Sequence, residues 1–192
     1  MPRKRKVYLL LREEREEVRE FIQEQLRKRY IQLSKSPQTA PVFFVEKKDR
    51  KKRMVQDYRY LNEWTIKNNY PLPLILDMLE NIGMKVFTKM DLRWGYNNVR
   101  IKEGDEWKAV FTTLEGFFEP TVMFFGLTNL PTIFQAIMNK LLRDLINTGK
   151  VMAFIDDVII GTEGEEGHDE LVVEVIKRLE ENDLYVKPEK CK

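Results

Sequence analysis

Apolar residues recur at three- and four-residue steps in three stretches of the chain, and this spacing predicts three amphipathic helices. The first helix is expected over residues 12–30, the second directly after Pro131 and the third after the acidic stretch that begins at Glu163. Proline is tolerated in the first turn of a helix, which places the start of the second one. The apolar faces of the three helices carry, in chain order, Val18, Phe21, Ile22 and Leu26; Phe134, Ile137, Met138, Leu141, Leu142 and Leu145; and Leu171, Val172, Val175, Ile176 and Leu179.

Short apolar runs between turn residues predict strands. These runs cover residues 42–47, 53–58, 86–91, 107–113, 117–123, 151–155 and 158–160. A short helix over 74–81, ended by Gly83, is expected between the second and third of them. Strands and helices follow one another without regular alternation. We therefore expect an α+β domain in which an antiparallel sheet is backed by helices.

Composition narrows the class of protein. The 192 residues suit one domain, with room for two lobes, and a large core. The single cysteine, Cys191, excludes an internal disulfide and a cysteine-based zinc site. No apolar run approaches the ~18 residues that cross a bilayer, so no membrane partner is expected. A net charge of +2 hides an uneven distribution, because residues 47–53 read KKDRKKR whereas nine acids lie within residues 163–183.

The basic run lies between two predicted strands, residues 42–47 and 53–58. A hairpin built from these strands displays the cations at its tip. The simplest interpretation is a solvated turn. However, six cations within seven residues repel one another unless an anion is present, which favours an anion-binding role.

Two adjacent acids, Asp156 and Asp157, interrupt the apolar run 154–160. They are either metal ligands or the exposed residues of a hairpin turn, and this run alone leaves both readings open. Asp91 ends the predicted strand 86–91 and would by itself be an ordinary helix N-cap. If the strand ending at Asp91 lies beside the 154–160 hairpin, three carboxylates converge, as a two-metal phosphoryl-transfer site requires.

Several ordered motifs carry a family resemblance. They are Phe154-Ile155-Asp156-Asp157, Asp91 followed by Tyr96, the segment 55–62 (VQDYRYLN), and Phe125-Gly126-Leu127-Thr128-Asn129 followed by Pro131 and Phe134-Gln135. From about Leu11 to its last residue the chain resembles the reverse transcriptases of gypsy-like LTR retrotransposons, particularly those of fungi. The resemblance implies a fingers-and-palm fold. It also implies an RNA-directed DNA polymerase that adds deoxynucleotides to a primer 3′ end on an RNA or DNA template.

The resemblance also assigns catalytic and nucleotide-binding residues. Asp91, Asp156 and Asp157 match the ligands of two Mg²⁺ ions, with Mn²⁺ as an alternative, and Asp157 is the ligand with the weakest claim to direct contact. Lys48 and Arg53 match the residues that grip the triphosphate of the incoming nucleotide.

Further residues are expected beside the nucleotide, template and primer. Tyr96 matches the steric gate that rejects a 2′-hydroxyl, although its own context reads as a core aromatic. Phe125 stands where retroviral enzymes have a glutamine, so its side chain gives the nucleotide no hydrogen bond. Gln135 is expected to support either the fold or the template. The positions expected near template and primer are Arg59, Gly126, Asn129, Pro131, Gln135 and Phe154.

The implied organisation has three parts: a basic tail and helix over 1–33, fingers over 34–85, and a palm over 86–192 into which part of the fingers returns near 104–125. Because the chain stops before the expected primer grip and thumb, no thumb is expected within it, and the thumb, connection and RNase H regions are expected to belong to a longer polyprotein. An intracellular location is expected, in a cytoplasmic virus-like particle or the nucleus.

Two other functions compete with this one. A catalytically inactive remnant would keep the fold and a nucleic-acid-binding surface. An RNA polymerase with a similar palm is disfavoured by Tyr96, since a small or polar residue is expected at its gate. Two weaker signals are set aside: Gly161, Gly164 and Gly167 predict a flexible linker, because the acids between them would repel phosphate, and His168 is expected in a solvated capping or surface role.

Overall fold

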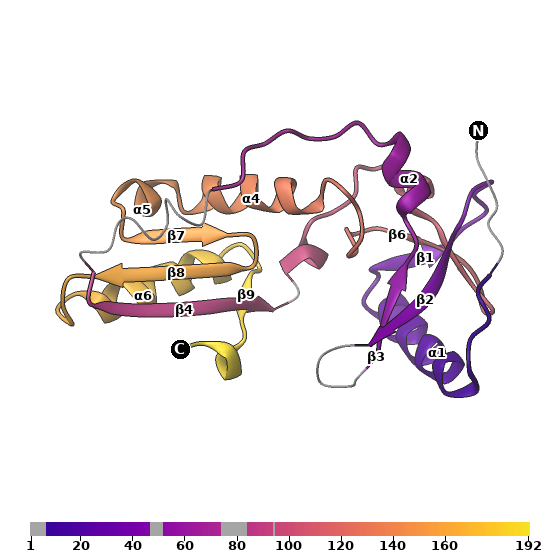
Figure 1. Cartoon of the computed structure of the whole chain (residues 1–192), viewed down its shortest axis with the longest axis horizontal. Helices are drawn as coiled ribbons and strands as arrows, with labels where there is room; N and C mark the ends of the chain where they lie inside the picture. The colour runs from indigo at the N-terminus through magenta and orange to yellow at the C-terminus, as the bar shows by residue number, and fades with distance from the viewer. Residues whose placement is uncertain (1–6, 47–51, 74–83, 94) are drawn as a thin grey trace. The chain divides into compact units, whose positions relative to one another are not determined.

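The computed structural model describes residues 7–46, 52–73, 84–93 and 95–192, and it divides into two compact units (Figure 1). The first unit comprises Met1–Ile66 and Val99–Leu130, and the second comprises Lys67–Asn98 and Pro131–Lys192. Each unit combines helices with a sheet, so the predicted α+β class is confirmed. The assignment of residues 34–85 to fingers and 86–192 to palm stays a prediction. The tip of the basic hairpin and the helix expected over 74–81 lie outside the described residues.

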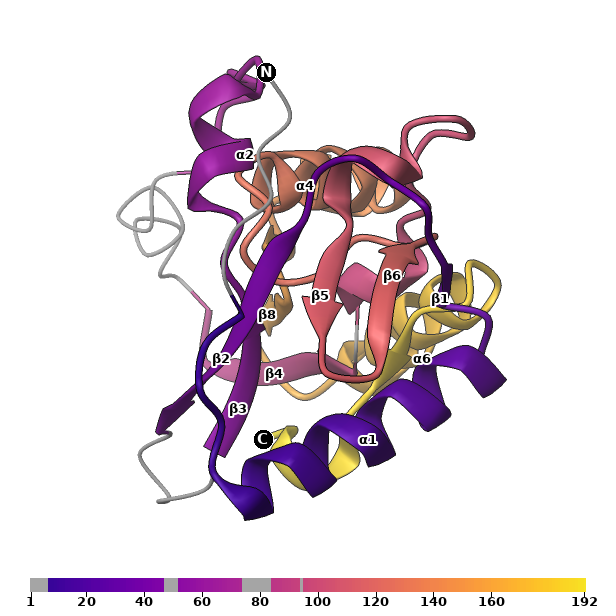
Figure 2. The same ribbon diagram turned by 90° about the vertical axis from the view of Figure 1, so that its right-hand side faces the viewer.

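The first unit is built on a five-stranded sheet with the order β1-β6-β5-β2-β3 (Figure 2). Its strands are β1 (Ile31–Leu33), β2 (Ala40–Glu46), β3 (Lys52–Gln56), β5 (Phe111–Thr113) and β6 (Gly116–Pro120). β2 and β3 pair antiparallel from Val42 opposite Gln56 to Glu46 opposite Lys52, which confirms the predicted hairpin. One pair is parallel, β2 with β5, so the sheet is not wholly antiparallel. The expected strand 107–113 begins instead with a 3₁₀ turn, Glu106–Ala109.

Helix α1 (Arg12–Arg27) packs its apolar stripe on this sheet through Val18 and Ile22, both nearly inaccessible. Leu26, predicted to face inward, is 38% exposed, and Gln25 is buried instead. The chain leaves the helix just beyond this point, where the Tyr30 N–H donates to the Gln25 carbonyl. The side chains of α1 that face the core are therefore those of residues 18, 22 and 25.

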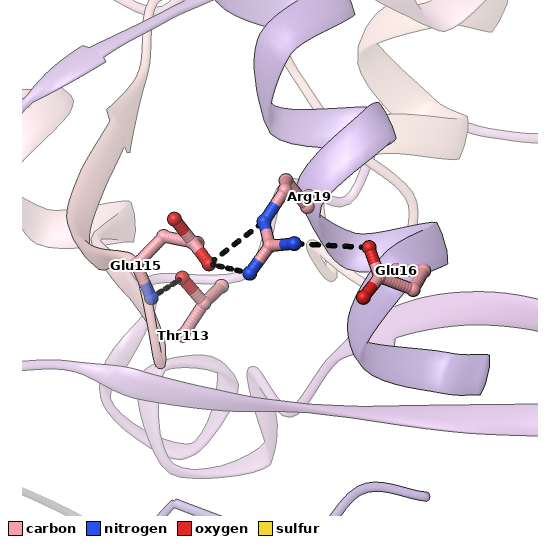
Figure 3. A network of polar contacts seen from close by, with 4 residues as sticks. All are labelled: Glu16, Arg19, Thr113 and Glu115. Atoms are coloured by element: carbon pink, nitrogen blue, oxygen red, sulfur yellow. Dashed lines mark hydrogen bonds and ion pairs between the residues drawn. The ribbon is translucent and has the colours of Figure 1, made fainter. Parts of the chain in front are cut away.

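Arg19 links the outer face of α1 to the turn between β5 and β6 (Figure 3). Its guanidinium lies 3.4 Å from Glu115 and 3.0 Å from Glu16. Exposed ion pairs of this kind contribute about 0–1 kcal/mol. The helix is therefore held mainly by its buried apolar residues, which join the core of the unit. The larger members of that core are Ile31, Val42, Tyr58, Phe111, Phe118 and Phe124.

The second unit contains an antiparallel sheet with the order β7-β8-β4-β9. Its strands are β4 (Val86–Arg93), β7 (Val151–Phe154), β8 (Asp157–Thr162) and β9 (Tyr185–Val186). Its helices are α4 (Leu130–Leu141), α5 (Arg143–Asn147) and α6 (His168–Glu180), with 3₁₀ turns at Gly95–Asn98 and Pro188–Lys190. Helix α2 (Arg59–Trp64) belongs to the first unit. None of the helices within the described ranges is long and apolar enough to cross a bilayer.

The predicted helix after Pro131 is interrupted at Leu142. Leu142 has φ −104° and ψ 15°, outside helical values, while its side chain stays fully buried. Phe134 and Met138, one turn apart on α4, are also completely buried, whereas Ile137 is 38% exposed. The apolar stripe therefore continues across the break, but in two helices.

His168 is buried rather than solvated, so the predicted surface role is wrong. Both ring nitrogens lie 2.8 Å from threonine hydroxyls, Nε2 from Thr88 and Nδ1 from Thr162. The Thr162 hydroxyl donates to the Gly164 carbonyl, so it accepts from Nδ1–H of the ring. Gly161 is also misplaced by the linker prediction, because it lies inside β8 opposite Phe87.

Candidate active site

The Asp156 carboxylate is displayed by a two-residue turn between β7 and β8. Phe154 pairs with Asp157, so Ile155 and Asp156 form the loop of the hairpin. Ile155 has φ +54°, a left-handed conformation that favours glycine at the first position of such a turn. A β-branched residue there stores about 1–3 kcal/mol of strain, which persists only if the surroundings hold it in place. Asp156 is therefore a turn residue and Asp157 is the first residue of β8, while the alternative role of the two acids as metal ligands stays a prediction.

Gln135 on α4 holds this turn from one side. Its Oε1 accepts from the Ile155 N–H at 2.8 Å, and its Nε2 donates to the Ala153 carbonyl at 2.8 Å. From the other side, the Leu92 N–H of β4 donates to the Asp156 carbonyl at 2.9 Å. Gln135 is completely buried, so of its two predicted roles the structure demonstrates support of the fold. We call this arrangement the Gln135 clamp.

Asp91 lies directly opposite Asp157 in the β4–β8 pairing. Side chains opposite one another on antiparallel strands have Cβ atoms about 4.5–5.5 Å apart. Asp91 lies inside β4 rather than at its end, and it is two residues from the Arg93 terminus. The turn thus brings Asp156 and Asp157 beside Asp91, although 65 and 66 residues separate them from it in the chain.

Lysines neutralise two of the three acids. Lys187 Nζ lies 2.7 Å from Asp91 Oδ1, Lys190 Nζ lies 3.5 Å from Asp91 Oδ2, and Lys89 Nζ lies 3.1 Å from Asp157 Oδ1. Burial alone would raise the pKa of Asp91. The hydrogen bond from Lys187 and the charges of Lys187 and Lys190 outweigh burial, so the pKa of Asp91 lies below its usual value.

Asp156 has the opposite electrostatic character. Burial raises its pKa to about 6, against the charge of Lys187 and a hydrogen bond from Tyr96, and the nearby charges of Asp91 and Asp157 add to the rise. Its Oδ1 atom is buried and has no hydrogen-bond partner among the described residues. A buried carboxylate oxygen without a partner is costly, and a cation is the partner that would satisfy it.

The donor set fits a hard divalent cation, since Mg²⁺ and Mn²⁺ take carboxylate oxygens. Across the described ranges, no three acidic, histidine or cysteine side chains are grouped closely enough to hold a metal ion as they stand. Asp91 and Asp157 direct oxygens at lysines instead. Binding of a cation between Asp91 and Asp156 would therefore require Asp91 to exchange Lys187 for the metal.

Tyr96 combines a core position with a polar contact at the acids. Its ring is 7% exposed and meets the Phe134 ring edge to face, with centroids 5.2 Å apart. Burial and the adjacent Asp156 raise the pKa of Tyr96, so the hydroxyl stays protonated and donates a hydrogen bond to Asp156. The interpretation as a core aromatic is thus correct for the ring, and the gate role of its face stays a prediction.

Two of the nucleotide-binding candidates lie together in the first unit. The Arg53 guanidinium carbon lies 5.2 Å from the centroid of the Phe125 ring, a cation–π contact. Lys48, the third candidate, lies outside the described residues. Gly126, next to Phe125, has φ +97°, which favours glycine.

Arg59 is held by a buried acid. Its Nε and Nη2 atoms donate to the two carboxylate oxygens of Asp57 at 2.8 Å each, its backbone N–H donates at 3.2 Å, and the Tyr8 hydroxyl donates at 3.1 Å. The bonds from Arg59 are the main reason why the pKa of Asp57 lies far below its usual value. The Arg59 side chain remains 75% exposed, so it is oriented by Asp57 but open to solvent.

The other candidates are distributed over both units. Asn129 Nδ2 donates to the Ile66 carbonyl at 2.8 Å in the first unit. Pro131 lies in the first turn of α4, and Phe154 ends β7 in the second unit. Their predicted proximity to template and primer is untested and stays a prediction.

Sequence reasoning missed several side chains that contact candidate residues. Among them are Lys89, Lys187 and Lys190, which pair with the acids, and Asn62, which bonds to both sides of the loop at Gly126. Lysine is common on surfaces, so nothing in the local pattern distinguishes these three. Asn62 lies within the VQDYRYLN motif, and its place in that motif could have identified it as a candidate residue.

The chain thus combines two α+β units, and the second carries the paired acids Asp91 and Asp157 on β4 and β8. Residues 45–192 match the family model described as "Reverse transcriptase (RNA-dependent DNA polymerase)". The chain therefore belongs to the reverse transcriptase family.

Among curated proteins, the chain is similar to retrotransposon polyproteins of Schizosaccharomyces pombe. It is 37% identical to the Transposon Tf2-3 polyprotein and 36% identical to the Transposon Tf2-7 polyprotein, each over 171 residues. Those matches cover 88% of this chain and 13% of each polyprotein, so the chain spans about one eighth of the length of these relatives. The resemblance to fungal, gypsy-like elements is consistent with them.

Among solved structures, the chain is similar to the foamy viral protease-reverse transcriptase in complex with an RNA/DNA hybrid. The TM-score is 0.89 at 25% identity, over 99% of this chain and 25% of that one. A second foamy viral structure, in complex with double-stranded DNA, has the same TM-score at 24% identity and covers 100% of this chain and 33% of that one. The predicted fingers-and-palm fold class is confirmed by these similarities.

Proposed function

We propose that this chain is the fingers-and-palm portion of an RNA-directed DNA polymerase, which adds deoxynucleotides to a primer 3′ end on an RNA or DNA template. The observation that carries the proposal is the pairing of Asp91 with Asp157 across β4 and β8, next to the turn residue Asp156, whose buried Oδ1 has no hydrogen-bond partner among the described residues. A purely structural turn gives no reason to bury that charge. Membership of the reverse transcriptase family supports the same reaction.

Asp91, Asp156 and Asp157 would hold two Mg²⁺ ions, with Mn²⁺ as the alternative. When bound, the ions would activate the primer 3′-hydroxyl and neutralise the charge that develops at the reacting phosphorus. The chain itself contributes rigid placement, since the Gln135 clamp fixes the turn that carries Asp156. Until a metal ion replaces it, Lys187 pairs with the ionised Asp91 carboxylate and balances its charge.

Lys48, Arg53 and Phe125 are proposed to receive the incoming deoxynucleotide, the first two through its triphosphate. Arginine suits this role because its planar fork pairs with phosphate oxygens at two points. Template and primer are proposed to pass near the six remaining candidates, Arg59, Gly126, Asn129, Pro131, Gln135 and Phe154. The thumb, connection and RNase H regions would come from a longer polyprotein that acts inside the cell, in a cytoplasmic virus-like particle or in the nucleus.

Primer extension tests the proposal directly. The chain, at high concentration with Mg²⁺, a DNA primer on an RNA template and deoxynucleotides, is expected to lengthen the primer. Removal of divalent cations by a chelator should stop extension, because the carboxylates alone cannot neutralise the transition-state charge. Salt-sensitive binding of the primer–template without any extension would instead support the inactive remnant.

Tyr96→Ala tests the steric gate. Removal of the ring should open space for a 2′-hydroxyl, so the preference for deoxynucleotides over ribonucleotides is expected to fall by at least about tenfold, equivalent to about 1.4 kcal/mol. Extension by the variant with each class of nucleotide, compared with the unchanged chain, measures this ratio. An unchanged ratio would limit Tyr96 to its packing against Phe134.

A further inference from the structure

The Arg53 side chain projects from β3 and lies over the face of an aromatic ring. Its guanidinium carbon is 5.2 Å from the centroid of the Phe125 ring, within the range of an attractive cation–π contact. The Phe125 side chain is 41% exposed and Arg53 is also exposed, so the contact does not serve to bury a core residue.

The loop that carries Phe125 is fixed to the same unit by hydrogen bonds. Asn62 Nδ2 donates to the Gly126 carbonyl at 2.7 Å, and Asn62 Oδ1 accepts from the Thr128 N–H at 2.9 Å. A Cβ atom on Gly126 would lie 3.5 Å from the Gln56 carbonyl oxygen, so the loop backbone passes directly beside the end of β3. Phe125 therefore directly precedes the loop segment that Asn62 holds by hydrogen bonds, and it lies next to the strand that carries Arg53.

This geometry restricts an otherwise flexible side chain. A free arginine side chain loses rotamer entropy when it binds a ligand. A ring that lies against the guanidinium limits the orientations of the side chain before the ligand arrives. A glutamine at position 125 has no aromatic face and could not hold Arg53 in this way.

We propose that Phe125 is a positioning residue for Arg53: its ring holds the guanidinium in the plane in which Arg53 receives the triphosphate of the incoming nucleotide. The inference rests on the proposed function, because it assumes that Arg53 grips phosphate. It changes the role of Phe125 from a nucleotide contact to an aromatic support that acts through Arg53.

Binding of inorganic tripolyphosphate to the chain, measured by calorimetry, tests the inference without any need for catalysis. Phe125→Leu is expected to weaken binding by about 2- to 5-fold, which corresponds to a cation–π contact at an exposed site. Phe125→Tyr keeps a ring and should stay within about 2-fold of the unchanged chain. Phe117→Leu is the matched control, because Phe117 is an equally exposed phenylalanine of the same unit, at 40%.

A comparison in the Arg53→Met background separates the positioning role of Phe125 from the phosphate-binding role of Arg53. If Phe125 acts through Arg53, Phe125→Leu should cause no further loss in that background. An equal loss there would mean that Phe125 contacts the ligand by itself and would overturn the inference. If Arg53→Met weakens tripolyphosphate binding but Phe125→Leu does not, the positioning role of Phe125 is overturned and the phosphate role of Arg53 stands. If Arg53→Met has no effect on binding, the phosphate role of Arg53 is overturned together with the positioning role of Phe125.

Proton NMR of the ligand-free chain adds a readout of the contact itself. Protons of the Arg53 side chain above the ring should be shifted upfield by the ring current, and the shift should disappear in Phe125→Leu but persist in Phe125→Tyr. No upfield shift in the unchanged chain would mean that the guanidinium does not rest on the ring in solution.

Discussion

Asp156→Asn is expected to abolish primer extension while it makes the metal-free chain more stable at neutral pH. Loss of one carboxylate from a two-metal site removes several kcal/mol of transition-state stabilisation, so extension should fall by at least about 10³-fold. The same substitution removes a buried charge whose Oδ1 has no partner in the described structure. After a reduction for its partial exposure, the gain in the free energy of unfolding is expected to be roughly 1 kcal/mol.

The gain should depend on pH. Because the pKa of Asp156 is raised to about 6 in the fold, the native state holds a proton that the unfolded state has already lost between about pH 4 and 6. Stability of the unchanged chain therefore falls, through this group, as the pH rises across that window, and the loss is complete above it. Asp156→Asn should lack this component, so the difference between the two chains should grow from pH 4 to 7.

Urea denaturation of both chains without metal, at several pH values, measures this difference, and the primer-extension assay measures the catalytic loss. Glu165→Gln is the matched control, since Glu165 is an exposed acid of the same unit and should change neither quantity. Equal stability of Asp156→Asn and the unchanged chain at pH 7 would mean that the Asp156 charge is not buried at a cost. Retained extension would remove Asp156 from the catalytic site.

Gln135→Leu is expected to destabilise the second unit by about 3 kcal/mol and to stop extension. The substitution leaves the Ile155 N–H and the Ala153 carbonyl without their partner, and an unsatisfied buried group costs about 1–3 kcal/mol. The Gln135 clamp also holds Ile155 at φ +54°, so its loss should let the turn relax and displace Asp156. The midpoint of urea denaturation and the extension rate are the measurements.

Ile155→Gly provides a second test of the same clamp. Glycine adopts positive φ without strain, so in the Gln135→Leu background it should recover about 1 kcal/mol. Gln23→Leu is a matched control, because Gln23 lies on the exposed face of α1 and should change stability by less than about 0.5 kcal/mol. If Gln135→Leu stays within 1 kcal/mol of the unchanged chain, Gln135 does not hold the turn.

Local patterns were sufficient for most of the elements. The spacing of Val18 and Ile22 predicts α1, and the apolar runs on either side of the basic segment predict the β2–β3 hairpin, because helix and strand periods are set by residues close in the chain. Local patterns failed where a contact with a residue distant in the chain determines whether a side chain is buried. Leu26 is exposed and His168 is buried, since the first depends on where the chain leaves α1 and the second on threonines from two strands.

The sequence by itself determined the family, the order of the main helices and strands, and the three acids as candidates. Only the tertiary structure decided how these acids are held: Asp91 against Lys187, Asp157 against Lys89, and Asp156, with its Oδ1 buried, on a strained turn that Gln135 supports. The physical reason is the distance along the chain. Periodicity and turn chemistry act over a few residues, whereas ion pairs and buried hydrogen bonds between residues 20 to 96 positions apart exist only once the strands have paired.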